Sequence, residues 1–269
     1  MADELDRAGK QRLVDDTPYW HHSIDLGDGV VTPGGKTPHH FYDELRRLKL
    51  PDLANKSVID IGAWDGFYTF HAEHLGARRV VALDHYAWSI DFKKAAAYQI
   101  NQLVIGQPIR PFHTVPEVWD PVGLPGKRGF DLAYRLRDSH AEVVVDDFMT
   151  MDVTALGTFD VVLFLGVIYH LENPMQALRR LRTLTHGVAV IESEGIWLPM
   201  SDGRPLWQFV SGTEFNRDPT IFWIPTAEGL RATCLAAGFA TAEIVSGPPL
   251  DEHGRERPIN YRAVVHAFS

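Results

Sequence analysis

The chain has 269 residues, of which 45% are hydrophobic and 23% are charged, and its formal net charge is −9. This composition is typical of a water-soluble protein with one α/β domain and insertions. An acidic chain gains little from attraction to phosphates, which disfavours nucleic acid as a partner. The single cysteine, Cys234, lies in an apolar helical pattern and excludes a disulfide framework within the chain, so we expect a cytoplasmic protein.

The N-terminal part of the chain differs in character from the rest. Its first residues are charged and lack the apolar stretch of a signal peptide, and no apolar run approaches the ~20 residues of a membrane span. Residues 1–40 are rich in Pro, Gly and His without a long periodic pattern, which predicts an ordered loop or lid. A short amphipathic helix is expected over 40–50, stopped by Pro51. We therefore divide the chain into an N-terminal lid segment with a helix (1–50) and a main domain (51–269).

Apolar strand patterns alternate with amphipathic helical patterns through the main domain. Strands are expected at 57–62, 78–84, 141–147, 159–166, 187–194, 240–247 and 261–268, and helices at 65–75, 91–103, 129–139, 173–185 and 226–239. Such alternation predicts a parallel sheet with helices on both faces. The last two strands have no helix between them, so a terminal antiparallel hairpin is expected.

A glycine-containing turn follows the first expected strand. Its sequence is Gly62-Ala63-Trp64-Asp65-Gly66, and a helix is expected to follow. A strand, a turn and a helix in this order hold nucleotide-like ligands in many α/β proteins. The dinucleotide fingerprint Gly-x-Gly-x-x-Gly requires a glycine where Trp64 stands, so the turn disfavours a nicotinamide dehydrogenase.

Acidic residues accompany three of the expected strands. Asp60 lies inside an apolar strand, where a carboxylate is costly unless donors or a cation pair with it. Asp84 ends the second strand, where it could accept hydrogen bonds from a ribose diol. Asp147 ends the third strand, with Asp146, where it could accept a bond from an adenine amine. Each acid alone could be an ordinary helix cap, but three of them beside the glycine turn favour a ligand.

These features resemble the class I S-adenosylmethionine-dependent methyltransferases, and the resemblance covers residues 58–268. Residues 58–66 match the pattern hydrophobic-Asp-hydrophobic-Gly-x-x-x-Gly. The resemblance implies an α/β, Rossmann-like fold, with a mostly parallel seven-stranded sheet and a terminal antiparallel hairpin, and S-adenosyl-L-methionine as cofactor. The turn glycines would flank the methionine portion, the acid after the second strand would bind the ribose, and the residues after the third strand would bind the adenine. The cofactor-binding residues implied in this way are Asp60, Gly62, Ala63, Trp64, Gly66, Asp84, His85, Asp147, Phe148 and Gly166.

Three segments resemble one methyltransferase subgroup more closely. They read YWHHSIDLGDGVVTPG (19–34), FLGVIYHLENPMQAL (164–178) and DPTIFWIPTAEGL (218–230). That subgroup includes enzymes that modify the wobble uridine of tRNA, and relatives whose acceptors are small molecules or sugars.

Candidate catalytic residues follow the fourth and fifth strands. His170 lies four residues after Gly166, so it is expected at the mouth of the cleft, where a histidine could serve as general base; the alternative is a histidine hydrogen-bonded in the following loop. Tyr169 could orient the acceptor or pack in the core. Glu192 and Glu194 end the fifth strand, and one of them could face the acceptor.

Two further segments bear on the acceptor. His21 or His22 could close over it as part of the lid; adjacent histidines rarely bind one ion, so no metal site is expected. Residues 195–224 contain Trp197, Trp207, Phe209, Phe215, Phe222 and Trp223. This insertion is expected to form an acceptor pocket, or else a hydrophobic cluster under a long loop.

The preferred hypothesis is a methyltransferase that acts on a hydroxyl of a small molecule, either a natural product or a sugar, with His170 as general base. One alternative is a tRNA wobble-uridine modifying enzyme. The resemblance to the subgroup supports this alternative, and the net charge of −9 opposes it. Another is a cofactor-binding protein without catalysis. The acceptor, the methylated atom and the oligomeric state stay open, with a homodimer as one candidate.

Overall fold

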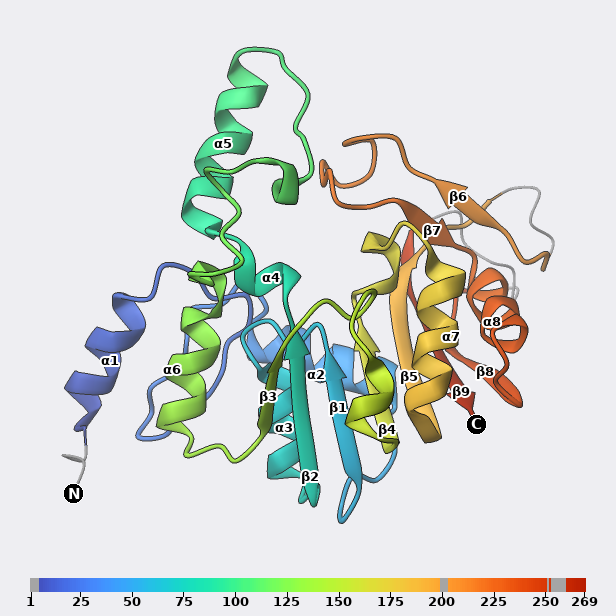
Figure 1. Ribbon diagram of the computed structural model, residues 1–269, viewed down its shortest axis with the longest axis horizontal. Coiled ribbons are helices and arrows are strands. Elements are labelled where there is room, and N and C mark those ends of the chain that lie inside the picture. The colour runs from blue at the N-terminus through green and yellow to red at the C-terminus, as the bar shows by residue number, and fades with distance from the viewer. Residues whose placement is uncertain (1–4, 199–202, 251, 253–259) are drawn as a thin grey trace.

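A seven-stranded sheet forms the centre of the computed structural model, which describes residues 5–198, 203–250, 252 and 260–269 (Figure 1). Its strand order is β3-β2-β1-β4-β5-β9-β8. The first five strands in this order pair in parallel, and β9 pairs antiparallel with both β5 and β8. The predicted sheet and its terminal hairpin are therefore confirmed. The strands are β1 (Ser57–Ile61), β2 (Arg79–Asp84), β3 (Glu142–Val145), β4 (Phe159–Leu165), β5 (Thr185–Gly195), β8 (Thr241–Ser246) and β9 (Tyr261–Phe268).

Helices cover both faces of the sheet, because alternate side chains of a strand point to opposite faces. Leu163 of β4 clusters with Leu48 of α2 on one face, and its neighbour Phe164 clusters with Leu181 of α7 on the other. Cys234 of α8 lies in the second cluster, and burial raises the pKa of its thiol to about 12, as befits a core residue. The helices here are α2 (Pro38–Leu48), α3 (Phe67–His74), α4 (Tyr86–Ser89), α5 (Phe92–Val104), α6 (Arg128–Leu136), α7 (Pro174–Leu184) and α8 (Ala227–Ala236).

Two predictions for the N-terminal segment need correction. Residues 7–15 form a helix, α1 (Arg7–Asp15), where no periodic pattern was expected. The Asp6 carboxylate caps it by accepting a hydrogen bond of 2.8 Å from Gly9 N, but Val14 is its one buried apolar residue, so the apolar period is too weak to read. The next helix, α2, spans 38–48 rather than 40–50, and it ends where Lys49 adopts a left-handed conformation, before Pro51 is reached.

The carboxyl ends of the parallel strands carry most of the irregular structure. β1 lies between β2 and β4, so the crossovers from these strands run in opposite directions and leave a switch point there. The insertion at 195–224 includes β6 (Trp207–Phe209) and β7 (Trp223–Pro225), which pair antiparallel; its residues 199–202 lie outside the described part. Figure 1 shows this insertion and the long helix α5 at the same end of the sheet.

Candidate active site

The glycine turn at the end of β1 requires glycine at both of its ends. Gly62 has φ = 82° and Gly66 has φ = 86°, a region that other residues rarely adopt. A Cβ on Gly62 would lie 2.5 Å from Val167 Cγ2, just past β4, and one on Gly66 would lie 2.4 Å from Phe70 Cε2. The turn therefore packs tightly between the end of β4 and α3.

Trp64 occupies the middle of this turn without disrupting it. Its backbone has φ = 49°, so it adopts the left-handed conformation that a glycine would adopt there. Its ring stacks on His21 with 3.8 Å between centroids and lies 5.4 Å from the Phe92 ring. The side chain thus turns toward the N-terminal segment and α5, which explains how the turn tolerates it. Ala63 is buried beside it.

Asp84 lies at the end of β2 beside the turn and is buried. Its Oδ2 accepts a hydrogen bond of 2.9 Å from Trp64 N, and its Oδ1 accepts one of 3.0 Å from Ala87 N. Burial raises the pKa of Asp84 to about 6, although the hydrogen bonds from backbone N–H groups act in the opposite direction and lower it. A carboxylate oxygen can accept more than one bond, so this arrangement leaves the predicted ribose contact open while tying Asp84 to the turn.

Asp60 lies in the middle of β1 and is also buried. Its Oδ2 accepts a hydrogen bond of 2.7 Å from Thr69 Oγ1 on α3. Burial raises its pKa to about 7, and the charges of Asp84 and Asp65 act in the same direction, although the Thr69 hydroxyl opposes them. Asp60 therefore ties the strand to the helix after the turn.

We expect Asp60→Asn to stabilise the protein at alkaline pH. The folded-state pKa lies above the ordinary value of 3.8, so stability is lost as the pH rises from about 4 to about 7. Asparagine keeps an oxygen for the Thr69 hydroxyl but carries no charge. The gain in the free energy of unfolding should be on the order of 2–3 kcal/mol larger at pH 8 than at pH 5, as measured by urea denaturation. An equal gain, or a loss, at both pH values would contradict the raised pKa.

The other residues predicted to bind the cofactor lie after β2 and β3. Asp147 Oδ1 accepts a hydrogen bond of 2.8 Å from Met149 N, so this carboxylate caps its own turn. Phe148 is buried in the core, 5.5 Å from the Phe164 ring. His85 lies at the start of α4, 5.6 Å from the Trp119 ring. The contacts of Asp147 and Phe148 with adenine, and of His85 with the cofactor, stay predictions.

Asp65, inside the turn, anchors the N-terminal segment. Its Oδ2 accepts hydrogen bonds of 3.0 Å from His21 N and 2.7 Å from His22 N, and its Oδ1 contacts His22 Nδ1. Burial, followed by the neighbouring His22 charge, lowers the pKa of His21 to about 2. The N-terminal segment is thereby fastened to the turn. Asp65 had no predicted role, although its place between Gly62 and Gly66 was a signal.

His170 is held by a short relay of side chains from the insertion. Its Nδ1 lies 3.1 Å from the Thr220 backbone oxygen and 2.8 Å from Thr220 Oγ1. Thr220 Oγ1 in turn donates a hydrogen bond of 2.5 Å to Asp218 Oδ1. Both Thr220 oxygens can then accept from Nδ1–H, which leaves the lone pair on Nε2 of the neutral ring. Thr220 and Asp218 lie in the segment 218–230, which resembles the methyltransferase subgroup, but their hydrogen bonds with His170 were not predicted.

An ion-pair cluster lies beside this relay at the ends of β5 and β9. Arg262 donates to both oxygens of the buried Glu192 and, at 2.6 Å, to Glu194 Oε1. Its Nη1 lies 3.3 Å from Tyr169 Oη. Burial raises the pKa of Tyr169 to about 12, so its hydroxyl keeps the proton at neutral pH. Gly166 lies close by, because a Cβ there would be 3.5 Å from Tyr169 Oη. Arg262 was not among the predicted site residues.

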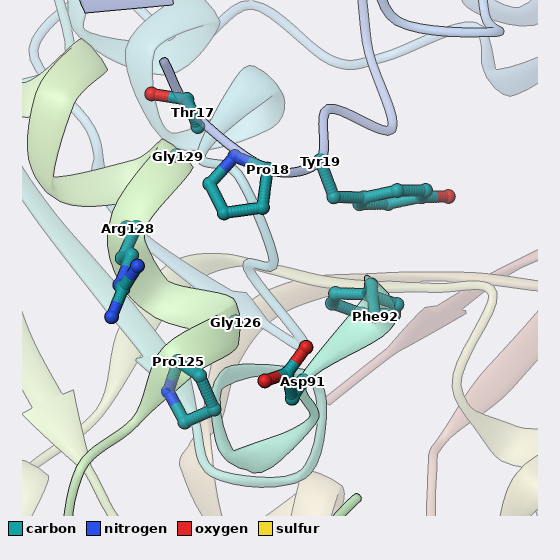
Figure 2. A pocket seen from close by; sticks show the side chains of 9 residues that line it. All are labelled: Thr17, Pro18, Tyr19, Asp91, Phe92, Pro125, Gly126, Arg128 and Gly129. Carbon is teal, nitrogen blue, oxygen red and sulfur yellow. The ribbon is translucent and has the colours of Figure 1, made fainter. Parts of the chain in front are cut away.

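A small pocket lies outside this group of residues. Figure 2 shows it between the N-terminal segment and the starts of α5 and α6, with the Tyr19 and Phe92 side chains on one side. It is lined by Thr17, Pro18, Tyr19, Asp91, Phe92, Pro125, Gly126, Arg128 and Gly129. None of these is a predicted site residue, but Tyr19 and Phe92 stack on Trp64, so the pocket adjoins the glycine turn.

Two further properties concern metals and membranes. In the part of the chain that the structure describes, no group of three His, Cys, Asp or Glu side chains is arranged to hold a metal ion. Across the same residues, no helix combines the length and the apolar character that a membrane span requires.

A Rossmann-like sheet with a glycine turn and buried acids at its switch point defines an α/β protein that binds a nucleoside-containing cofactor. The chain belongs to the methyltransferase-domain family, whose model matches residues 36–244. Its mostly parallel seven-stranded sheet with a terminal antiparallel pair is the Rossmann-like fold of the class I S-adenosylmethionine-dependent methyltransferases.

Curated relatives carry the name tRNA U34 carboxymethyltransferase. The Campylobacter hominis protein is 22% identical over 209 residues, which cover 77% of this chain and 58% of the relative. A Campylobacter jejuni protein is 27% identical over 206 residues, which cover 77% of this chain and 57% of the relative. The chain thus spans less than two thirds of the length of these relatives.

Solved structures share the fold. The N-terminal domain of EvdMO1, crystallised in the presence of S-adenosylhomocysteine and D-fucose, superposes with a TM-score of 0.61 at 16% identity, over 98% of this chain and 97% of that one. Full-length EvdMO1 has a TM-score of 0.57 at 17% identity, over 100% of this chain and 49% of that one.

Proposed function

We propose that this methyltransferase acts on a hydroxyl group of a small molecule, a natural product or a sugar. The observation that carries the proposal is the relay of Asp218, Thr220 and His170, which leaves a lone pair on His170 Nε2. Among the described residues, no hydrogen-bond partner is found for Nε2. A neutral imidazole suits the removal of a hydroxyl proton at neutral pH.

The chemistry required of the protein is modest. When bound, S-adenosylmethionine supplies a methyl group that is already electrophilic, so the residues around it must mainly align the acceptor and exclude water. His170 Nε2 would take the proton of the acceptor hydroxyl as its oxygen bonds to the methyl carbon, while the methyl–sulfur bond would break with S-adenosylhomocysteine as the leaving group. Tyr169, protonated at neutral pH, would orient the acceptor, and the N-terminal segment would cover the turn as a lid held by Asp65.

Two observations favour a neutral small molecule over a polyanion. The formal net charge is −9, and the Arg262 guanidinium beside His170 is already paired with Glu192 and Glu194. The solved relative crystallised with D-fucose supports a sugar as one acceptor class. A tRNA acceptor is the second candidate, because the curated relatives are named for tRNA modification.

Both candidate functions require the cofactor, so we expect S-adenosylhomocysteine to raise the free energy of unfolding by about 2.7 kcal/mol at 100 times its Kd. The two candidates differ in their expected affinity for nucleic acid. We expect tRNA at physiological salt to leave the chain unshifted in a native gel. A tRNA complex that forms tightly and weakens steeply with added salt would favour the second candidate. Thermal unfolding and gel shift on the same preparation provide the comparison.

The acceptor class is tested by product analysis. The protein is incubated with S-adenosylmethionine carrying an isotopically labelled methyl group and with sugars and phenols of small size, and the products are examined by mass spectrometry. Label on a hydroxyl oxygen supports the proposal. Label found on tRNA alone would overturn it in favour of the second candidate.

A further inference from the structure

Three aromatic side chains meet beyond the carboxyl end of β2, on α4 and on the segment that returns from α5. Trp119 lies 5.0 Å from Tyr86 and 6.3 Å from His113 between ring centroids, and the planes of the three rings meet at angles of 51° to 78°. The rings therefore present faces in several directions instead of covering one another. We call Tyr86, His113 and Trp119 the aromatic cluster. His85, which directly follows Asp84, lies 5.6 Å from the Trp119 ring, so the cluster adjoins the predicted cofactor site.

The backbone holds Trp119 in place. Asp91 N donates a hydrogen bond of 2.8 Å to Val118 O, and Asp120 N donates one of 2.8 Å to Ser89 O. These two bonds flank Trp119 in the sequence and attach the returning segment to the junction of α4 and α5. The indole is therefore a fixed surface, and a rigid aromatic ring loses little conformational entropy when a ligand binds.

The aromatic cluster is open to solvent and keeps polar atoms free. Tyr86 is 37% exposed, His113 is exposed and Trp119 is half-buried. No hydrogen bond from a described residue reaches Trp119 Nε1 or the ring nitrogens of His113. Aromatic faces beside free hydrogen-bonding groups are typical of a ligand site, whereas a core cluster would cover its rings.

The aromatic cluster also adjoins the relay of His170. Figure 1 shows the segment that returns from α5 opposite the insertion, beyond the ends of the parallel strands. Burial raises the pKa of Tyr86, and the charge of Asp218 acts in the same direction, against a hydrogen bond from the Phe112 backbone. Asp218 is the carboxylate that accepts from Thr220 beside His170. The cluster therefore borders the space in which the acceptor is expected.

The chemistry of the aromatic cluster matches a sugar ring. An aromatic face is negative and attracts the polarised C–H groups of a sugar, while indole, imidazole and phenol groups can form hydrogen bonds with its hydroxyls. Each ring of the cluster carries such a group, whereas an apolar aromatic ligand needs none. The charge of Asp218 and the net charge of −9 disfavour an anion. The ligand that fits is therefore a neutral ring with several hydroxyl groups.

We propose that the aromatic cluster binds the ring of a neutral sugar acceptor, which packs on Trp119 and forms hydrogen bonds with Tyr86 and His113. This inference rests on the proposed function and narrows it from small-molecule hydroxyls to sugars. It also assigns recognition of the acceptor to the segment 86–119, outside the insertion at 195–224.

The test measures sugar binding by ligand-observed NMR titration. The protein is saturated with S-adenosylhomocysteine, and the ligands are neutral monosaccharides, D-fucose among them, and phenol. We expect at least one monosaccharide to bind more tightly than phenol. Trp119→Leu should weaken its binding by about 3- to 10-fold, the usual effect of losing an aromatic contact, and His113→Ala by about threefold. The affinity for S-adenosylhomocysteine, measured by calorimetric titration, should change by less than about twofold.

Two further variants and a kinetic measurement serve as controls. Trp119→Phe keeps a ring on which the sugar can pack, so it should lose less affinity than Trp119→Leu. Tyr42, on α2, is 63% exposed and belongs to neither predicted site, so Tyr42→Leu should change no affinity. Thermal unfolding checks each variant, and His113→Ala, at an exposed position, decides the question even if Trp119→Leu is unstable. With a sugar that is methylated, both cluster variants should raise KM and leave kcat within about twofold, because the ring contacts are remote from the reacting hydroxyl.

The outcomes separate this inference from the proposed function. Unchanged sugar affinity in Trp119→Leu and His113→Ala, or no binding of any monosaccharide, would overturn the sugar site. Phenol that is bound and methylated while no sugar binds would overturn the sugar site as well, yet it would leave the proposed hydroxyl chemistry intact. Methyl transfer to tRNA alone would overturn the proposed function itself.

Discussion

Replacement of His170 by asparagine is expected to slow methyl transfer by about 10²–10⁴-fold, the usual contribution of a positioned general base. Asparagine keeps a polar side chain that can reach Thr220, but it cannot accept a proton near neutral pH. Cofactor affinity should change by less than about twofold, because His170 bonds to the insertion and not to the glycine turn. Single-turnover rates and calorimetric titration with S-adenosylhomocysteine measure the two quantities separately.

The relay offers a graded control for this prediction. Thr220→Val removes the hydroxyl that joins Asp218 to His170 but keeps the backbone oxygen that also accepts from Nδ1. We expect a loss of about tenfold, since one of two hydrogen bonds that orient the ring is retained, and Thr220→Ser should restore the rate. If His170→Asn turns over like the wild type, the base lies elsewhere, with His22 and Glu194 as the next candidates. A loss of cofactor binding would make His170 a structural residue.

The pH dependence of the rate should follow the state of His170. Burial lowers its pKa, although the charge of Asp218 opposes this, so the ring is neutral and able to act as a base at pH 7. The single-turnover rate should therefore stay level above neutrality and fall only at acid pH. Because the folded-state pKa lies below the ordinary value of 6.5, this residue also makes stability fall as the pH drops below about 6.5, and His170→Asn should lessen that loss.

Loss of Arg262 is expected to lower the free energy of unfolding by about 3–5 kcal/mol, because Glu192 would then be left as a buried charge without its main partner. The Glu192 side chain is 1% exposed and Arg262 binds both of its oxygens. Arg47, at 3.9 Å, is too distant to replace this pairing fully. Urea denaturation of Arg262→Met measures the change.

A surface ion pair provides the matched comparison. Arg231 and Glu228 lie three residues apart on α8, and their side chains are 33% and 26% exposed. Arg231→Met should cost less than about 1 kcal/mol, because exposed pairs are screened by solvent. The double variant Arg262→Met with Glu192→Leu should regain much of the stability lost by Arg262→Met, since no unpaired charge then stays buried. Similar losses for Arg262→Met and Arg231→Met would contradict the buried-charge argument.

Local patterns in the sequence were sufficient to predict the sheet. Apolar runs such as 159–166, separated by amphipathic stretches, specify strands and helices because each period reports which side chains face the core. The missing helix between the last two strands predicted the antiparallel pair of β8 and β9. The helix α1 escaped prediction, because its single buried apolar residue leaves no period to detect.

The sequence also predicted the position of the glycine turn and of the acids beside it, whereas their contacts with a cofactor stay predictions. Gly62 and Gly66 adopt positive φ values at the turn, and Asp60 and Asp84 lie buried beside it, because strand ends and turns are determined by neighbouring residues. The sequence alone did not predict whether the turn could accommodate a tryptophan at position 64. The structure answers this, since the N-terminal segment and α5 provide rings for it to stack on.

The partners of the polar side chains at the site were decided by the tertiary structure alone. Asp65 meets His22 across 43 residues, His170 meets Thr220 across 50, and Glu192 meets Arg262 across 70. No local period links residues so far apart. They meet because parallel strands bring their carboxyl ends to one edge of the sheet, where the N-terminal segment, the insertion and β9 converge. The sequence by itself thus determined the fold and the position of the turn, and the packing at that edge decided which side chains bond there.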